Sequence, residues 1–137
     1  PISDIKGEWV QSLKGVSILI VDDESELREI LAEEFLAMGA AVRTASGGDE
    51  GFEVFEEFQP TVVLSDVRMS GGDGVSLLAR IRQRYPTAPP YVFLLSGYAE
   101  LHQGDAKTLR FEELIPKPFS LKKLRARVLE VTRQVSP

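Results

Sequence analysis

The sequence predicts an α/β domain with a doubly wound parallel sheet, because three features of the chain agree on it. Five short apolar segments recur along the 137 residues, and five segments with helical spacing of apolar residues alternate with them. Glycine or proline separates most of these segments, as expected where helices and strands end. The strand segments are apolar throughout, which is typical of a sheet covered on both faces, and right-handed crossovers place helices on both sides.

The first half of the chain contains three expected strands and two expected helices. The strands are expected at residues 16–21, 40–45 and 61–65. The first helix is expected over residues 25–38, where apolar side chains recur every three or four residues and Gly39 follows as a stop signal. The second is expected from about residue 46, with three phenylalanines on one face, and Pro60 ends it.

The second half contains the remaining two strands and three helices. The strands are expected at residues 91–95 and 113–115. The helices are expected at about residues 75–85, 99–109 and 120–135, and the middle one has the weakest apolar periodicity. Residues 1–15 precede this pattern, so we expect an N-terminal extension or linker, with a short amphipathic helix, before a domain over residues 16–137.

Composition excludes several classes of function. The chain has no cysteine, which excludes a disulfide framework, a thiolate metal site and a cysteine nucleophile. Its net charge of −5 argues against a nucleic-acid-binding surface over the whole domain. No apolar run approaches the roughly 18–20 residues that span a bilayer, and the N-terminus has no signal-peptide pattern. A cytoplasmic protein without a membrane partner is therefore expected.

Polar side chains stand where the expected strands end. They are Asp22 and Asp23, Asp66, Ser96 and Lys117. The carboxyl ends of parallel strands meet at one edge of the sheet, where doubly wound folds place their functional sites. Each residue alone has an ordinary interpretation: a solvated helix start, a turn former or a loop lysine. We interpret their joint placement as a site.

Three carboxylates brought together repel one another unless a cation neutralises them. Oxygen ligands, without a histidine or cysteine cluster, favour Mg²⁺ over Zn²⁺. A carboxylate can also attack phosphorus and form an aspartyl phosphate, while a lysine and a hydroxyl suit phosphoryl oxygens. The set contains what phosphoryl transfer requires: a nucleophile, metal ligands, a cation and a hydroxyl.

The same residues resemble a known family. Asp22-Asp23, Asp66, Ser96 and Lys117-Pro118-Phe119, in this order, with the stretch Asp66-Val67-Arg68-Met69…Asp73-Gly74, resemble the signature of response-regulator receiver domains. The resemblance covers about residues 16–135. It implies a flavodoxin-like (βα)5 fold of the chemotaxis-regulator type, with strand order 2-1-3-4-5, in a two-component or phosphorelay system.

The resemblance also implies a role for each site residue. Asp66 would be the phosphoacceptor and a metal ligand. Asp23 would bind Mg²⁺ directly, Asp22 would assist through water, and the backbone carbonyl of Arg68 would be the third protein ligand. Ser96 and Lys117 would contact the phosphoryl group, and the bond from Lys117 to the following proline would be cis.

The implied partners follow from this signalling role. A sensor histidine kinase or a histidine phosphotransfer protein would donate the phosphoryl group, and an output domain or a downstream protein would read the response. The switched face would comprise the fourth helix, the fifth strand and the fifth helix, through which many receivers also form homodimers. Such a protein is not an enzyme, although it assists its own phosphorylation and dephosphorylation.

The sequence departs from the family pattern in four places. Leu114 stands where the family usually has an aromatic residue that rotates during switching. Ser96 replaces the common threonine. Ser70-Gly71 replaces the usual proline after the methionine, so we expect a more flexible loop. Residues 103–111 lack the common Gly-Ala, so the fourth helix is expected to be the least typical region.

Other interpretations stay open. Leu114 and the unusual fourth helix motivate a phosphorylation-independent interaction module with the same fold. An aspartyl phosphatase would need an acid at the position of Arg68. A flavin site would need a phosphate-binding loop after the first strand. His102 lacks ligand partners and is expected to be exposed, and the basic residues of the last helix are expected to form a solvated face.

Overall fold

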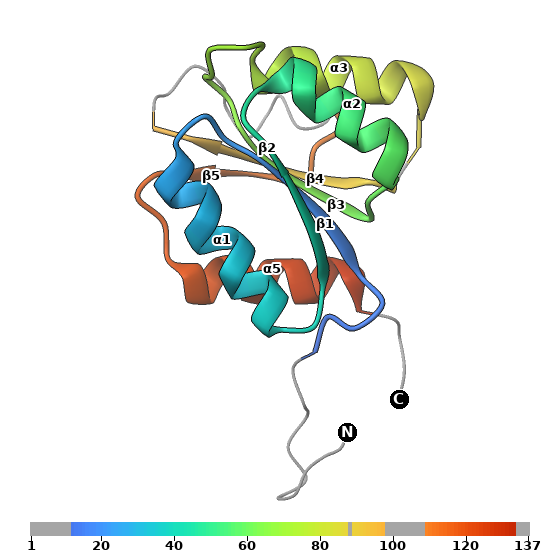
Figure 1. Ribbon diagram of the computed structural model, residues 1–137. Coiled ribbons are helices and arrows are strands. Elements are labelled where there is room, and N and C mark those ends of the chain that lie inside the picture. Colours follow the sequence, from blue (N-terminus) through green and yellow to red (C-terminus); the bar gives the residue numbers. More distant parts are fainter. Residues whose placement is uncertain (1–11, 88, 98–108, 134–137) are drawn as a thin grey trace, which may run out of the picture.

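The computed structural model describes residues 12–87, 89–97 and 109–133 (Figure 1). Its elements are β1 (Ser17–Val21), α1 (Ser25–Ala37), β2 (Ala41–Ala45), α2 (Gly48–Phe58), β3 (Val62–Asp66), α3 (Gly74–Arg84), β4 (Tyr91–Ser96), β5 (Glu113–Pro116) and α5 (Leu121–Thr132). Residues 98–108, which include His102 and nearly all of the helix expected at about residues 99–109, lie outside the described residues, as do residues 1–11. Of the segment before β1 in which a short helix was expected, residues 12–15 are described and are not helical.

The five strands form one parallel sheet in the order β2-β1-β3-β4-β5. This order confirms the predicted doubly wound fold. The register aligns the strand ends: Val21 pairs with Ser65, Asp66 with Leu95, and Ser96 with Pro116. The residues that follow β1, β3, β4 and β5 therefore emerge at a single edge of the sheet.

Helices cover both faces of the sheet, with α1 and α5 on one side and α2 and α3 on the other (Figure 1). Alternate residues of β1 supply the two cores: Ile18 and Ile20 pack with α1 and α5, while Leu19 and Val21 pack with α2 and α3. All four side chains are fully buried. This explains why the central strands are apolar throughout, since each face of the sheet needs its own core.

The apolar stripe of α1 is wider than the surface it buries. Leu31 and Phe35 are fully buried, but Ile30 and Leu36 are 48% and 54% exposed. Helical spacing predicted the helix correctly and could not separate the two groups, because all four lie within one broad apolar arc.

The core begins before the first strand. Leu13 is buried, and its backbone N–H donates to the carbonyl of Met38 at 2.7 Å. The proposed domain boundary after residue 15 stays a prediction. No helix in the described ranges is long and apolar enough to cross a membrane.

Candidate metal centre

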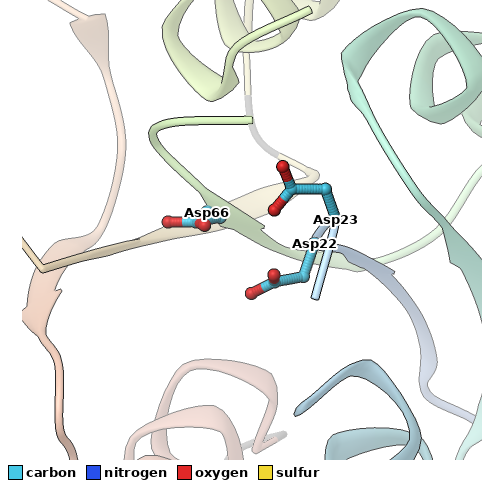
Figure 2. Close-up of side chains that lie close together, drawn as sticks. All are labelled: Asp22, Asp23 and Asp66. Carbon is cyan, nitrogen blue, oxygen red and sulfur yellow. The ribbon is translucent and has the colours of Figure 1, made fainter. Parts of the chain in front are cut away.

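Three carboxylates gather at the carboxyl edge of the sheet (Figure 2). Asp22 and Asp23 follow β1, and Asp66 is the last residue of β3. One oxygen from each lies within 4.8 Å of the others. Asp22 is fully buried and Asp66 is 8% exposed, whereas Asp23 faces solvent. The register of the two strands holds these like charges together, and a hard divalent cation fits such an all-oxygen set.

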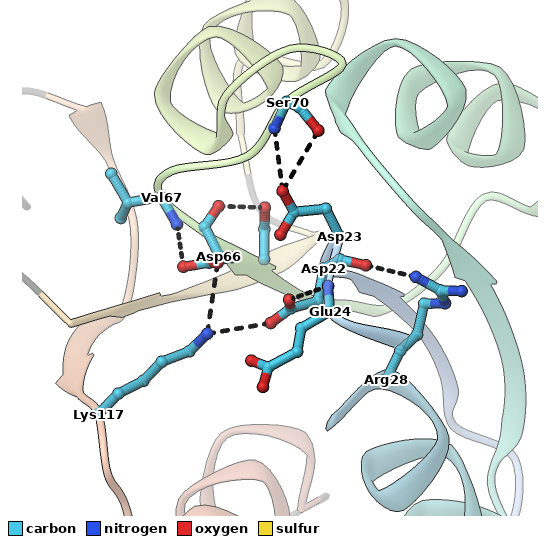
Figure 3. Close-up of polar contacts among 9 residues, drawn as sticks. Asp22, Asp23, Glu24, Arg28, Asp66, Val67, Ser70 and Lys117 are labelled. Carbon is cyan, nitrogen blue, oxygen red and sulfur yellow. Dashed lines mark hydrogen bonds and ion pairs between the residues drawn. The ribbon is translucent and has the colours of Figure 1, made fainter. Parts of the chain in front are cut away.

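Protein donors occupy both oxygens of Asp22. Its Oδ1 accepts a hydrogen bond from the backbone N–H of Glu24 at 2.9 Å, and its Oδ2 lies 3.2 Å from Lys117 Nζ. Arg28 also donates to the Asp22 carbonyl at 2.7 Å (Figure 3). These contacts fix the orientation of the Asp22 carboxylate, which lies buried below the exposed Asp23 at the end of β1.

Lys117 bridges two of the acids. Its Nζ lies 3.2 Å from Asp22 Oδ2 and 3.3 Å from Asp66 Oδ2 (Figure 3). Its backbone N–H donates to the Ser96 carbonyl at 2.7 Å, which ties the end of β5 to the end of β4. The bond from Lys117 to Pro118 is cis, as the resemblance implied.

The site carries more negative than positive charge. Burial raises the pKa of Asp66, and the charge of Asp22 raises it further, while Lys117 and a hydrogen bond from the Val67 N–H oppose the rise. Burial alone would lower the pKa of Lys117, but Asp22 and Asp66 raise it more, so its pKa lies above the ordinary value. Three carboxylates face one ammonium, so the cluster lacks two positive charges, which a divalent cation would supply.

Ser96 and Arg68 lie on the same edge. Ser96 is the last residue of β4 and is buried, one strand away from Asp66. Arg68 lies two residues after Asp66, in the loop between β3 and α3, and it lines an open depression together with Asp23, Met69, Ser70 and Asp73. The structure thus brings four predicted residues into one cluster, and it places Ser96 and Arg68 beside them; the four are Asp22, Asp23, Asp66 and Lys117.

Sequence reasoning missed one contact. Ser70 donates its backbone N–H to Asp23 Oδ2 at 3.0 Å, and its hydroxyl lies 3.4 Å from the same oxygen (Figure 3). We expected flexibility at this loop, yet it is tied to the end of β1. The sequence showed only that serine has the N–H that proline lacks, and it did not show which group that N–H reaches.

The comparisons with known proteins agree with this geometry. The family model described as "Response regulator receiver domain" matches residues 18–129. The transcriptional regulator NtrC of Klebsiella pneumoniae is 34% identical over 106 residues, which cover 74% of this chain and 22% of that protein. The regulatory protein AtoC of Escherichia coli is 34% identical over 108 residues, 78% of this chain and 23% of AtoC. The chain thus spans less than a quarter of the length of these relatives.

Solved structures resemble the whole domain. The response regulator protein TrrA of Thermotoga maritima, in complex with Mg²⁺ and BeF, has a TM-score of 0.74 and 29% identity, over 85% of this chain and 98% of that one. A chain of the CheX–CheY–BeF3–Mg²⁺ complex of Borrelia burgdorferi has a TM-score of 0.78 and 25% identity, over 87% of this chain and 90% of that one.

Proposed function

The chain belongs to the family of response regulator receiver domains, and on this premise we propose that Asp66 accepts a phosphoryl group in a Mg²⁺-dependent reaction. The observation that carries the proposal is the position of the Asp66 carboxylate. It ends β3 inside the acidic cluster, and its Oδ2 lies 3.3 Å from Lys117 Nζ. A nucleophile, a metal-ligand set and a cation therefore share one edge of the sheet.

Asp23, Asp66 and the backbone carbonyl of Arg68 would hold the ion, with Asp22 assisting. When bound, Mg²⁺ supplies positive charge to the phosphoryl oxygens and to the carboxylates. The support comes from the donor set: one oxygen from each of three acids lies within 4.8 Å of the others. Mg²⁺ prefers such oxygens and retains waters for the remaining positions.

The residues of the chain would divide the reaction between them. An Asp66 oxygen forms the new bond to phosphorus, and the bond to the donor's leaving group breaks. Lys117 already faces Asp66, so its ammonium would pair with a phosphoryl oxygen. The Ser96 hydroxyl, at the end of the neighbouring strand, would bond another. The domain would assist this transfer and the later hydrolysis, in which water attacks phosphorus, the bond to Asp66 breaks and inorganic phosphate leaves.

The donor would be a phosphorylated histidine of a sensor kinase or a phosphotransfer protein, as in a two-component system. An apolar groove beside Lys117 supports the approach of a protein there. Its apolar lining comes from the side chains of Leu27, Ile30, Pro118, Phe119 and Leu121, on α1 and on the segment from β5 to α5. Ile30, which is 48% exposed, would contact that partner.

The response would pass to an output domain or another protein through the face that includes β5 and α5, and two copies would pair through it. Leu114, which stands where the family usually has an aromatic residue, is buried in the core on the α2 and α3 side, so no aromatic ring is available to rotate at this position. A cytoplasmic location, with no nucleic-acid contact by this domain, fits such a role. The phosphorylation-independent module is the weaker candidate, because the acidic set is complete.

Intact-mass spectrometry after incubation with acetyl phosphate tests the proposal. We expect one phosphoryl adduct in Mg²⁺ and none after chelation. Asp66→Asn should abolish the adduct, since the amide is not a nucleophile. Asp73→Asn is the matched control, because this exposed loop aspartate caps α3 through the Ser76 N–H and asparagine caps equally well. An adduct that persists in Asp66→Asn would contradict the assignment.

A further inference from the structure

Ser70 joins two segments that are far apart in the sequence. It lies in the loop between β3 and α3, and its N–H and hydroxyl reach Asp23 Oδ2 at 3.0 and 3.4 Å, across 47 residues. The N–H bond is the shorter and has ordinary hydrogen-bond geometry, whereas the hydroxyl contact is long. The backbone of residue 70 is thus the main donor to this carboxylate.

The two oxygens of Asp23 face different groups. Oδ2 is turned toward Ser70, and the other oxygen points toward Asp66 and Asp22 (Figures 2 and 3). Asp23 is exposed, and the orientation of an exposed carboxylate varies widely unless hydrogen bonds hold it. The bond to Ser70 therefore selects the orientation that leaves one oxygen free for the acidic cluster.

The loop is fixed independently of Asp23. The N–H of Gly48 donates to the Gly72 carbonyl at 2.8 Å, and the N–H of Asp49 donates to the Gly71 carbonyl at 3.0 Å. A Cβ on Gly48 would come within 2.8 Å of the Gly72 carbonyl oxygen, so only glycine permits this approach. The first turn of α2 thus sets the position of the loop, and Ser70 presents its donors from a preformed backbone.

We propose that Ser70 is a positioning residue for the divalent cation, holding Asp23 by Oδ2 so that its other oxygen faces the metal site. The proposal rests on the proposed function, which places Mg²⁺ among Asp22, Asp23 and Asp66. Hydrogen bonds that orient metal-binding carboxylates commonly change metal affinity by about 10-fold or more. Since this carboxylate faces solvent, we expect a change at the lower end of that range.

Two substitutions separate the donors. Ser70→Ala keeps the N–H and loses only the long hydroxyl contact, so the Mg²⁺ dissociation constant should stay within about 2-fold of that of the unmodified protein. Ser70→Pro removes both donors and should raise the constant about 10-fold. Isothermal titration calorimetry of the whole chain with MgCl₂, without any phosphodonor, measures both. Thermal unfolding in EDTA and in Mg²⁺ shows whether the proline variant folds and whether the ion stabilises it less.

A measurement on the unmodified protein complements the variants. The temperature dependence of the Ser70 amide-proton shift reports its hydrogen bond, and the bond should persist when Mg²⁺ is added. Loss of that bond on metal binding would mean that Ser70 competes with the ion, and unchanged or tighter Mg²⁺ binding by Ser70→Pro would likewise overturn the proposal. If the unmodified protein does not bind Mg²⁺, both proposals fail. Mg²⁺ binding without an acetyl phosphate adduct overturns the proposed function alone.

Discussion

Asp66 is a charged side chain in a place where burial and a neighbouring acid oppose its charge. Its pKa is raised first by burial and then by Asp22, and Lys117 offsets only part of this rise. The pKa of Asp66 is therefore higher in the folded protein than in the unfolded chain, where it is about 3.9. Below the unfolded pKa, Asp66 is protonated in both states and does not change the free energy of unfolding. As the pH rises from there through the folded pKa, the free energy of unfolding decreases. At neutral pH the ionised Asp66 therefore destabilises the metal-free domain.

Asp66→Asn should thus raise the stability of the metal-free protein at pH 7 by about 1 kcal/mol, or roughly 3–5 °C in Tm. Thermal unfolding in EDTA, followed by circular dichroism, measures the change. The gain should shrink as the pH falls toward 4, and in Mg²⁺ it should vanish, because the ion stabilises only the carboxylate. A lower Tm for Asp66→Asn in EDTA at pH 7 would show that the bond to Lys117 outweighs the burial.

The residues of the site were predictable to different degrees. Asp22, Asp66 and Lys117 stand at strand ends, so the topology alone places them at one edge. The bridge from Lys117 to two acids depends on side-chain geometry, which spacing does not contain. The contact of Ser70 depends on the path of a loop in which Gly71 and Gly72 adopt φ of 69° and 99°, and no periodic pattern encodes that path.

At the scale of the element, the start of α3 depends on one glycine. A Cβ on Gly74 would lie 2.1 Å from the Asp66 carbonyl oxygen, a severe clash with backbone. Gly74→Ala must therefore push α3 away from the end of β3, and we expect a loss of at least about 2 kcal/mol of unfolding free energy and slower phosphorylation. Urea unfolding measures the loss.

Gly97→Ala is the matched control for this substitution. A Cβ at Gly97 meets nothing within 4 Å, so the unfolding free energy should change by less than about 0.5 kcal/mol. Equal stabilities for the two variants would show that α3 can move away from β3 without loss.

Helix α1 provides a test of what its exposed apolar residues do. Leu31 is fully buried and Ile30 is 48% exposed, although they are neighbours in the sequence. Leu31→Ala should cost about 2–5 kcal/mol, because it leaves a cavity. Ile30→Gln should cost less than about 0.5 kcal/mol of unfolding free energy.

The exposed side chain of Ile30 also tests the proposed partner groove. If Ile30 contacts a histidine-phosphorylated partner, Ile30→Gln should slow phosphoryl transfer from that partner at least about 5-fold, while the rate of phosphorylation by acetyl phosphate should not change. Equal rates from the partner would remove Ile30 from the interface.

At the scale of the whole molecule, the sheet was the most predictable feature. Continuous apolar strands such as Ile18–Val21 require cover on both faces, and parallel strands joined by helices leave few topologies. The strand order came from the resemblance and is confirmed as β2-β1-β3-β4-β5. Helical spacing grouped Leu13 with an expected N-terminal helix, but residues 12–15 are not helical, and the burial of Leu13 follows from the turn that leads into β1.

Binding of Mg²⁺ should stabilise the folded domain, because the three acids are brought together only in the folded chain. Asp22 and Asp66 are 44 positions apart and meet through the pairing of β1 with β3, so the unfolded chain offers the ion no comparable site. Mg²⁺ at ten times its dissociation constant should then add about 1.4 kcal/mol, or roughly 4–6 °C in Tm.

Differential scanning calorimetry across a Mg²⁺ series measures this shift, and NaCl of equal ionic strength controls for screening. Asp23→Asn should abolish the shift, because it removes the exposed carboxylate that faces the ion while the buried Asp22 and its hydrogen bonds remain in place. A shift of equal size in Asp23→Asn would mean that Mg²⁺ acts elsewhere on this acidic protein, whose net charge is −5. The rise in Tm would then not report Mg²⁺ binding at the acidic cluster, and only the mass of the phosphoryl adduct would identify the phosphoacceptor.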